Sequence, residues 1–336
     1  MNISQRQLRM FTAVAQEMNF SRASATLNIS QPALTRAIRE FEAQLGVLLF
    51  QRTTRRLTLS EEGRRLLPVA QRLIDDMRQA VAELRAPAAG LGGTVTIATG
   101  TAFGCTVLPR VLLEYTRRHP QVRVVLRDDN SEGITARVAR AEVDFGIGSI
   151  IRADVVLTAV KLLDAPLGIL AHPGHFALPR RASPPCLARL PLLKEADDTS
   201  IMQLLRQHGA GIVAAMERGV EVSNLATQLA LAAAGVGVAV LSALGASHAD
   251  ARHLAFVPLA PAIRREVFLM HRFDRPLRPA ARALWDLILT ELPRAPLHER
   301  VTVAAQPNAE PQSVTSTSRS TPAAKQAAPR SSGNRR

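Results

Sequence analysis

The sequence predicts an α/β protein in two unequal parts, a small and mostly helical N-terminal unit and a larger part in which strands and helices alternate. Three observations support this fold class. The 336 residues suffice for about two domains. Apolar side chains recur at helical spacing as far as residue 84. After the Pro/Gly/Ala segment 86–93, short apolar strands alternate with helical stretches, the pattern of βαβ units with a parallel sheet.

The N-terminal unit is predicted to contain three short helices. Residues 4–18 carry apolar side chains at helical spacing. Ser21 is expected to cap a second helix, and a third is expected to run from its N-cap Ser30 to Gly46. Pro32 falls in the first turn of the third helix, where a missing N–H costs nothing. The second and third helices would then meet at a short turn, as in a helix-turn-helix corner.

A hairpin and a long helix are predicted to follow. Residues 47–60 are rich in β-prone side chains and hold a polar Thr-Thr-Arg-Arg tip, as a hairpin requires. Residues 61–85 carry an apolar stripe at helical spacing along their length. Because this stripe continues past the compact N-terminal unit, we expect a partner helix to cover it.

The run 225–246 is uncharged and long enough to cross a bilayer, but its pattern favours a buried position. Gly235 and Gly237 divide it, and β-branched residues fill its second half. This predicts a helix that ends at a glycine and leads into a buried strand. Arginines interrupt the first residues, so no signal peptide is predicted. We therefore expect a soluble, cytoplasmic protein without membrane contact.

The cysteines and the C-terminal tail point to no special chemistry. Cys105 and Cys186 match neither a disulfide framework nor a metal site, so we expect buried thiols, a reducing compartment, no cofactor and no metal. Residues 297–336 hold six basic and two acidic side chains among Pro, Ser, Thr and Ala. Such a tail buries too little apolar surface to offset the entropy of ordering, so a disordered basic tail is predicted.

Positive charge collects on one face of the N-terminal unit. The formal net charge of +14 favours acidic partners such as nucleic acid. Opposite the apolar face of the third helix lie Gln31, Thr35, Arg36 and Arg39. These side chains can hydrogen-bond base edges and phosphates, and they occupy the half that a recognition helix presents to the major groove. The basic hairpin Arg52–Arg56 follows where a wing would lie. Together they predict a winged helix-turn-helix that binds double-stranded DNA.

Residues 1–63 resemble the N-terminal domain of LysR-type transcriptional regulators. The residues that carry the resemblance are Leu8, Phe11, Val14, Ala15, Phe20, Ser21, Arg22, Ala23, Leu27, Ser30, Gln31, Pro32, Ala33, Leu34, Arg36, Ile38, Glu42, Leu45, Gly46, Leu49, Phe50, Arg52, Leu59 and Gly63. Departures at Ser24, Thr35, Phe41 and Ser60 remove no groove-facing donor. The resemblance implies DNA contacts by Ser21, Arg22, Ser30, Gln31, Pro32, Thr35, Arg36, Arg39, Arg52, Thr53, Arg55 and Arg56.

The resemblance covers nearly the whole chain and implies a division into four segments. These are a DNA-binding domain at 1–60, a linker and dimerisation helix with its hinge at 61–92, an effector-binding domain at 93–296, and the tail 297–336, which has no counterpart in the family. The effector-binding domain would be a periplasmic-binding-protein-like pair of α/β subdomains with a small molecule in the cleft between them. Subdomain I would comprise 93–160 and 269–292, and subdomain II 161–268.

Ligands of such a cleft meet the carboxyl ends of strands and the N-termini of helices. The residues predicted to bind the effector are Thr99, Thr101, Ala102, Asn130, Ser131, Gly148, Thr199, Ser200 and Asn224. The alternative is that they are ordinary helix caps. Four acidic residues fall near the same cleft, Asp128, Asp129, Asp197 and Asp198. They favour a cationic or zwitterionic effector over a purely anionic one.

Two functions remain open on the sequence. The first is a sequence-specific transcription regulator at the bacterial nucleoid, whose DNA contacts change when a small-molecule effector binds. Its partners would be operator DNA, the effector, further copies of the chain in a homodimer or homotetramer, and RNA polymerase if it activates. The second is a sequence-tolerant architectural DNA-binding protein whose C-terminal domain senses nothing. An enzyme with catalytic residues is not expected, because no dinucleotide fingerprint, P-loop or nucleophile elbow occurs.

Overall fold

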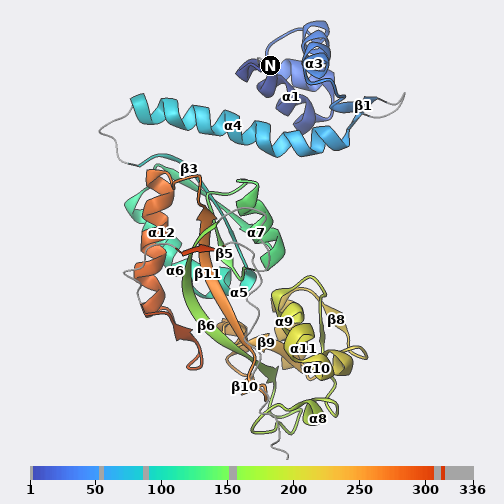
Figure 1. Ribbon diagram of the computed structural model, residues 1–336, viewed down its shortest axis with the longest axis vertical. Helices are drawn as coiled ribbons and strands as arrows, with labels where there is room; N and C mark the ends of the chain where they lie inside the picture. The colour runs from blue at the N-terminus through green and yellow to red at the C-terminus, as the bar shows by residue number, and fades with distance from the viewer. Residues whose placement is uncertain (1–2, 53–56, 86–90, 151–156, 306–311, 315–336) are drawn as a thin grey trace, which may run out of the picture.

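The computed structural model describes residues 3–52, 57–85, 91–150, 157–305 and 312–314. The molecule is elongated, with the small N-terminal unit at one end, a long helix beside it, and a two-lobed α/β part beyond (Figure 1). The N-terminal elements are α1 (Gln5–Glu17), α2 (Phe20–Thr26), α3 (Gln31–Leu45), β1 (Phe50–Arg52), β2 (Leu57–Leu59) and α4 (Glu61–Arg85).

Local capping explains where the N-terminal helices begin. The Ser30 hydroxyl accepts a hydrogen bond from the Ala33 amide, and Pro32 lies in the first turn of α3, as predicted. The prediction that Ser21 caps α2 is wrong. Asn19 is the N-cap, and its side-chain oxygen accepts from the backbone amides of Ser21 and Arg22. Asparagine and serine cap about equally well, so the sequence alone does not choose between two neighbouring candidates.

The three helices enclose a small aromatic core, from which α4 extends. Phe11 of α1 and Phe41 of α3 are fully buried, and their ring centroids lie 6.3 Å apart. The predicted apolar stripe of α4 is only partly used by this core. Leu73, Met77 and Val81 remain 48%, 52% and 37% exposed, respectively. Within one copy of the chain, the distal part of α4 therefore presents an uncovered apolar face.

The C-terminal part forms two lobes that share one nine-stranded sheet among the described residues. The first elements are β3 (Gly93–Thr99), α5 (Thr101–Thr106), α6 (Leu108–Arg118), β4 (Val122–Asp128), α7 (Ser131–Ala139), β5 (Phe145–Gly148) and β6 (Leu157–Ala171). The next are α8 (Pro184–Leu187), β7 (Lys194–Glu195), α9 (Ser200–His208), α10 (Ala210–Met216), β8 (Glu221–Val222), α11 (Leu225–Ala233), β9 (Ala239–Ser242), β10 (Ala255–Pro258), β11 (Arg264–Arg272) and α12 (Pro279–Glu291).

Parallel pairing occurs in the first lobe, and two long strands cross into the second. β3 pairs in parallel with β4 and β5, as the alternation of strands and helices predicts. β6 pairs with β11 in the first lobe and then with β9 and β10 in the second (Figure 1). Along β6, Ala165 belongs to the first core and Leu167 to the second. The resemblance implies boundaries between the subdomains at 160/161 and 268/269. The division between the two cores lies a few residues from each of these boundaries.

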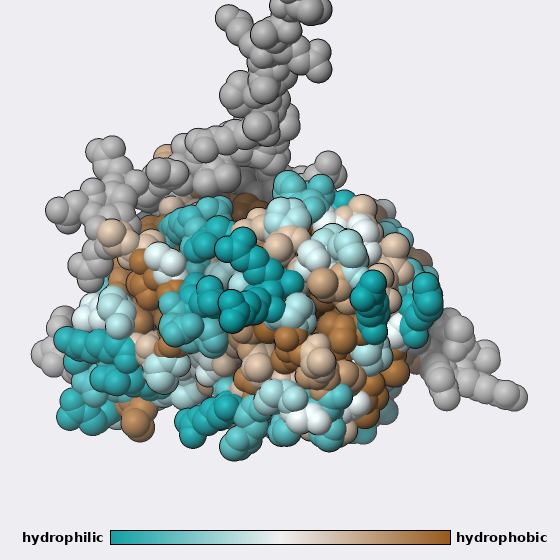
Figure 2. Space-filling model, turned by 90° about the horizontal axis from the view of Figure 1, so that it is seen from below, coloured by the Kyte–Doolittle hydropathy of each residue, from teal (hydrophilic) through white to brown (hydrophobic). Residues whose placement is uncertain are grey.

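The second lobe is built around the uncharged run of the sequence. α11 leads through Gly235, which has a left-handed φ of +75°, into the buried strand β9. The predicted helix and strand are thus confirmed. No described helix is long and apolar enough to cross a bilayer. Seen from the end of this lobe, the surface mixes hydrophilic side chains with smaller hydrophobic areas (Figure 2).

Two expectations are corrected outside the site. Residues 297–305 are ordered although the whole tail was predicted to be disordered. β12 (Thr302–Val303) pairs with the edge of β6, and Leu297, Val301 and Val303 pack against the core of the first lobe. The edge of β6 supplies backbone partners that the tail's composition does not reveal. Cys105 is exposed rather than buried, because α5 buries only Phe103.

Candidate functional site

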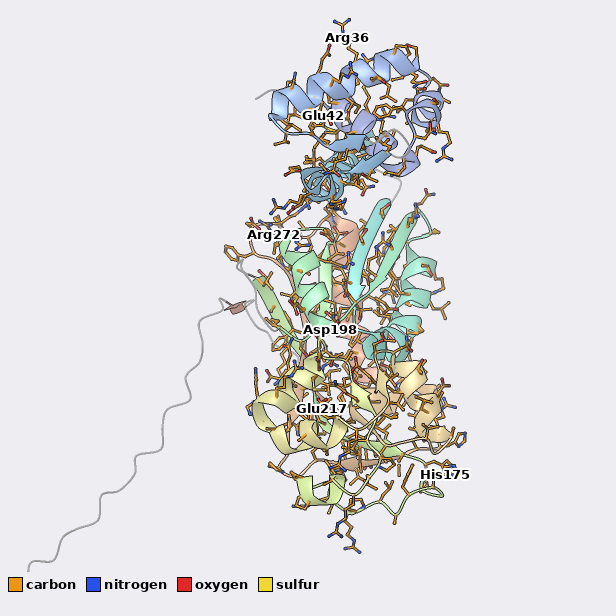
Figure 3. The ribbon with its side chains drawn as sticks, turned by 90° about the vertical axis from the view of Figure 1, so that its right-hand side faces the viewer. Arg36, Glu42, His175, Asp198, Glu217 and Arg272 are labelled. Carbon is orange, nitrogen blue, oxygen red and sulfur yellow. The ribbon has the colours of Figure 1, made fainter. Side chains whose placement is uncertain are left out.

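The polar face of α3 points away from the rest of the molecule. Arg36 projects from the outer end of the N-terminal unit (Figure 3). Gln31, Pro32, Thr35, Arg36 and Arg39 line one shallow hollow on this face. The buried Leu34 and Ile38 hold the opposite face against the core. The structure thus brings together five of the predicted DNA-contacting residues on one exposed surface.

Hydrogen bonds orient the side chains of this surface. The Ser21 hydroxyl donates to Oε1 of Gln31 at 3.0 Å, which joins α2 to α3. Arg22 forms an ion pair with Glu17 at 3.2 Å. Nε of Arg36 lies 2.9 Å from Oε1 of Glu40, and both side chains are well exposed. An exposed pair of this kind contributes little stability, so Arg36 can exchange Glu40 for another anion at small cost.

A buried carboxylate, Glu42, to which the resemblance gave no role of its own, connects β1 to α3. Glu42 of α3 accepts hydrogen bonds from the amides of Leu49 and Phe50 at 2.8 and 3.1 Å. These bonds anchor the start of β1 to α3. Among the predicted wing contacts, Arg52 is the last residue of β1, and its side chain lies outside the described residues. Thr53, Arg55 and Arg56 also lie outside them.

A cavity of about 330 Å³ lies between the two lobes. Seven of the predicted effector residues line it, namely Thr101, Ala102, Asn130, Ser131, Gly148, Thr199 and Ser200. They come from strand ends and helix starts of both lobes, which meet at the level of Asp198 (Figure 3). Nδ2 of Asn130 donates to Oδ2 of Asp198 across this junction at 2.8 Å. The cavity therefore has walls from both lobes and one direct hydrogen bond between them.

Two predicted effector residues and one acidic residue do not line the cavity. Thr99 is fully buried in β3, and its hydroxyl donates to the Gly100 carbonyl. Asn224 caps α11, with its side-chain oxygen accepting from the amides of Ala226 and Thr227. Asp197 pairs with Arg206 at 2.6 Å. Position at the end of a strand indicates the neighbourhood of a residue but not the direction of its side chain.

Polar residues outside the predicted set also line the cavity, among them Glu195, Gln228 and Arg265. Nε of Arg265 on β11 donates to the Ser200 hydroxyl at 2.9 Å. Nε2 of Gln228 donates to Oε2 of Glu195 at 2.5 Å. No local motif marks these residues, because Arg265 and Ser200 are 65 positions apart and meet only through the packing of the two lobes.

Burial shifts the pKa values of Glu195 and Arg265. Desolvation raises the pKa of Glu195 to about 7, against the opposing effect of the hydrogen bond from Gln228. Desolvation lowers the pKa of Arg265 to about 10, so its guanidinium remains charged at neutral pH. The cavity thus contains a permanent cation and a carboxyl group that titrates near neutrality. Such an arrangement suits the recognition of a polar ligand.

Family models match both parts of the chain. The model described as "Bacterial regulatory helix-turn-helix protein, lysR family" matches residues 5–64, and the "LysR substrate binding domain" matches residues 88–293. The first of these covers the surface on α3, and the second covers the cavity between the lobes.

Relatives are similar over most of their length. The SDS degradation transcriptional activation protein of a Pseudomonas species is 33% identical over 305 residues, which cover 87% of this chain and 97% of that protein. The HTH-type transcriptional regulator YfeR of Shigella flexneri is 30% identical over 297 residues, covering 86% and 94%.

Solved structures share the fold. A full-length OxyR variant from Pseudomonas aeruginosa has a TM-score of 0.64 at 21% identity, covering 91% of this chain and all of that one. CbnR in complex with its target DNA has a TM-score of 0.62 at 20% identity, covering 87% and 99%. Because the family models match both parts of the chain and the Pseudomonas relative is 33% identical over 87% of it, the chain belongs to the LysR family of DNA-binding transcription regulators.

Proposed function

We propose that the chain binds operator DNA through α3 and the wing, as a homodimer or homotetramer, and that a small molecule in the cavity between the lobes changes this binding. The observation that carries the proposal is a cavity with polar walls from both lobes in the same chain as an exposed, basic recognition face. A ligand that contacts both walls stabilises one relative orientation of the lobes over others. A protein that only spaced its DNA-binding units would not need such a cavity.

A physical connection between the cavity and the DNA-binding unit supports the proposal. β11 begins beside the cavity, where Arg265 lies, and ends at Arg272. Beyond its end, Arg275 forms an ion pair with Asp76 of α4, and Nη1 of Arg278 lies 3.8 Å from the same carboxylate. A change in the lobes that moves β11 therefore acts on the helix that carries the DNA-binding unit.

The test measures protection of promoter DNA and binding to random DNA by the full chain. We expect Gln31→Ala to weaken operator binding about 5- to 100-fold, the range for loss of a base-specific contact, and to leave binding to random DNA nearly unchanged. Arg36→Ala should also weaken operator binding, with a smaller loss on random DNA because it removes a positive charge.

Arg206→Ala is the matched control, because it removes one exposed arginine from α9, far from α3. It should bind operator and random DNA as the parent chain does. Uniform protection of all DNA by the parent chain would favour the sequence-tolerant architectural protein. Unchanged operator binding by the Gln31 and Arg36 variants would show that α3 is not the recognition helix.

The remaining features of the proposal follow from DNA binding. The chain would work at the nucleoid in the bacterial cytoplasm and would act without catalysing a reaction. If it activates transcription, it would also contact RNA polymerase. The relatives identified above are named as transcriptional regulators, which supports this assignment.

A further inference from the structure

Arg265 offers unused hydrogen-bond donors to the cavity. Its Nε is occupied by Ser200, whereas Nη1 and Nη2 have no hydrogen-bond partner among the described residues. Among the described residues, every buried side-chain nitrogen has a hydrogen-bond partner. Nη1 and Nη2 have none, so they are not buried, and because Arg265 lines the cavity they are accessible from it. Nη2 comes within 3.9 Å of the place where a Cβ on Gly100 would stand, so the guanidinium spans from β11 to the end of β3.

The two free ends of this guanidinium match a carboxylate. A planar fork of N–H donors binds the two oxygens of a carboxylate in parallel, which an ammonium group cannot do. Ser200 is the first residue of α9, a helix of nine residues whose N-terminal end carries a partial positive charge. An anionic group held by Arg265 and Ser200 would therefore lie at a favourable helix end. This end of the cavity therefore offers an anionic group donors from β11 and α9.

Carboxylates outnumber cations on the rest of the wall. Asp128, Asp129, Glu195 and Asp198 all line the cavity. Asp129 is neutralised by Arg137 at 2.8 Å, but the other three form no ion pair among the described residues. Three carboxyl groups therefore face one guanidinium. A purely anionic ligand would find Arg265 but would also meet these acids, and a purely cationic ligand would leave Arg265 unmatched.

We propose that the cavity binds a compact zwitterion of the amino-acid type. Its carboxylate is held by Arg265 and Ser200, and its protonated amine faces Asp128, Glu195 and Asp198. The cavity volume of about 330 Å³ is at the small end of ligand pockets and suits such a molecule. This inference rests on the proposed function, because it specifies the ligand of the same cavity.

The experiment uses the full chain and sets of three compounds with one carbon skeleton: an amino acid, the carboxylic acid without its amine, and the amine without its carboxyl group. A thermal-unfolding screen of the twenty amino acids selects the skeleton, since a ligand that binds the folded state raises its stability. Calorimetric titration then measures the three affinities. We expect the amino acid to bind at least about 10-fold more tightly than either partial compound, as for loss of a charged hydrogen-bonding partner.

Variants locate the two ends of the ligand. Arg265→Ala should weaken binding of the amino acid by about 10- to 100-fold, and Arg265→Lys, which keeps the charge but not the fork, should fall between it and the parent. Asp128→Asn should weaken binding of the amino acid more than binding of the acid that lacks the amine. Arg264→Ala is the control, because Arg264 is the neighbour of Arg265 but pairs with Asp164 outside the cavity. It should bind the amino acid as the parent does.

The outcomes separate this inference from the proposed function. Three results would each contradict binding of a zwitterion. These are equal binding by the acid without the amine, unchanged binding by the Arg265 variants, and no stabilisation by any amino acid. If that acid binds, depends on Arg265 and alters operator protection, the ligand-responsive regulator stands with another ligand. If an amino acid binds as expected but leaves operator protection unchanged, the ligand class stands and the proposed response fails. Operator protection by the Arg265 variants without ligand checks that they fold.

Discussion

The buried side chain of Glu195 makes the stability of the folded chain depend on pH. Its side chain is 6% exposed, and its carboxyl group receives a hydrogen bond from Gln228. Desolvation raises its pKa from an ordinary 4.5 to about 7 in the folded chain. The unfolded chain therefore loses this proton at lower pH than the folded chain does. Stability is consequently reduced as the pH rises from about 4.5 through about 7.

The corresponding prediction concerns Glu195→Gln, which keeps an oxygen acceptor for Gln228 but cannot ionise. We expect it to stabilise the ligand-free chain relative to the parent, by about 2 kcal/mol more at pH 8 than at pH 5. Chemical unfolding at the two pH values measures this difference. Glu217→Gln, at an exposed carboxylate, should show no comparable change between the two pH values. An equal effect of Glu195→Gln at both pH values would contradict the assigned ionisation.

At the scale of elements, the uncovered face of α4 is the most informative feature. The stripe is apolar at helical spacing but remains about half exposed in one chain. Covering it with a second helix removes apolar surface from water and therefore stabilises the assembly. The family resemblance implies that this helix mediates dimerisation. The structure adds which residues are available for that contact, namely Leu73, Met77 and Val81.

We predict that Met77→Glu weakens self-association, because dimerisation would then bury two charges without partners. The dissociation constant of the dimer should rise by at least about 100-fold, as measured by sedimentation over a range of concentrations. Arg65→Gln changes the charge of α4 by the same amount at an exposed position away from the stripe and should associate normally. Normal association of Met77→Glu would place the dimer contact on another element.

At the scale of the whole molecule, one carboxylate links the two functional parts. Asp76 of α4 contacts both Arg275 and Arg278, which follow the strand that begins at the cavity. We predict that Asp76→Asn keeps the affinity for a cavity ligand within about 2-fold but reduces the ligand's effect on operator protection. Titration and footprinting on the same preparation measure the two quantities.

The matched control is Asp286→Asn, which breaks the exposed ion pair with Arg282 within α12; Asp286 does not line the cavity and forms no ion pair with the described residues of α4. It should retain both ligand affinity and the response of the operator complex. A full response in Asp76→Asn would mean that the lobes act on the DNA-binding unit by another route.

Sequence reasoning succeeded where a few neighbouring residues decide the structure. The cap at Ser30, the proline beside it and the apolar spacing of α3 act within single turns, so they predict both the helix and its exposed face. The second helix shows the limit of this reasoning, because Asn19 and Ser21 are both suitable caps. The ordered residues 297–305 show another limit, since the partner that orders them is an edge of β6 far away in sequence.

By itself, the sequence determined the two-part fold, the helix α3 with its exposed polar face, the long helix α4 and seven of the residues that line the cavity, because local periodicity and strand ends depend on residues close together in the chain. Only the tertiary structure decided that Thr99 and Asn224 turn away from the cavity and that Glu195 and Arg265 enter it. The physical reason is that β6 and β11 cross both lobes. Their packing joins side chains from distant parts of the chain, and it thereby sets the arrangement of charges on the cavity wall.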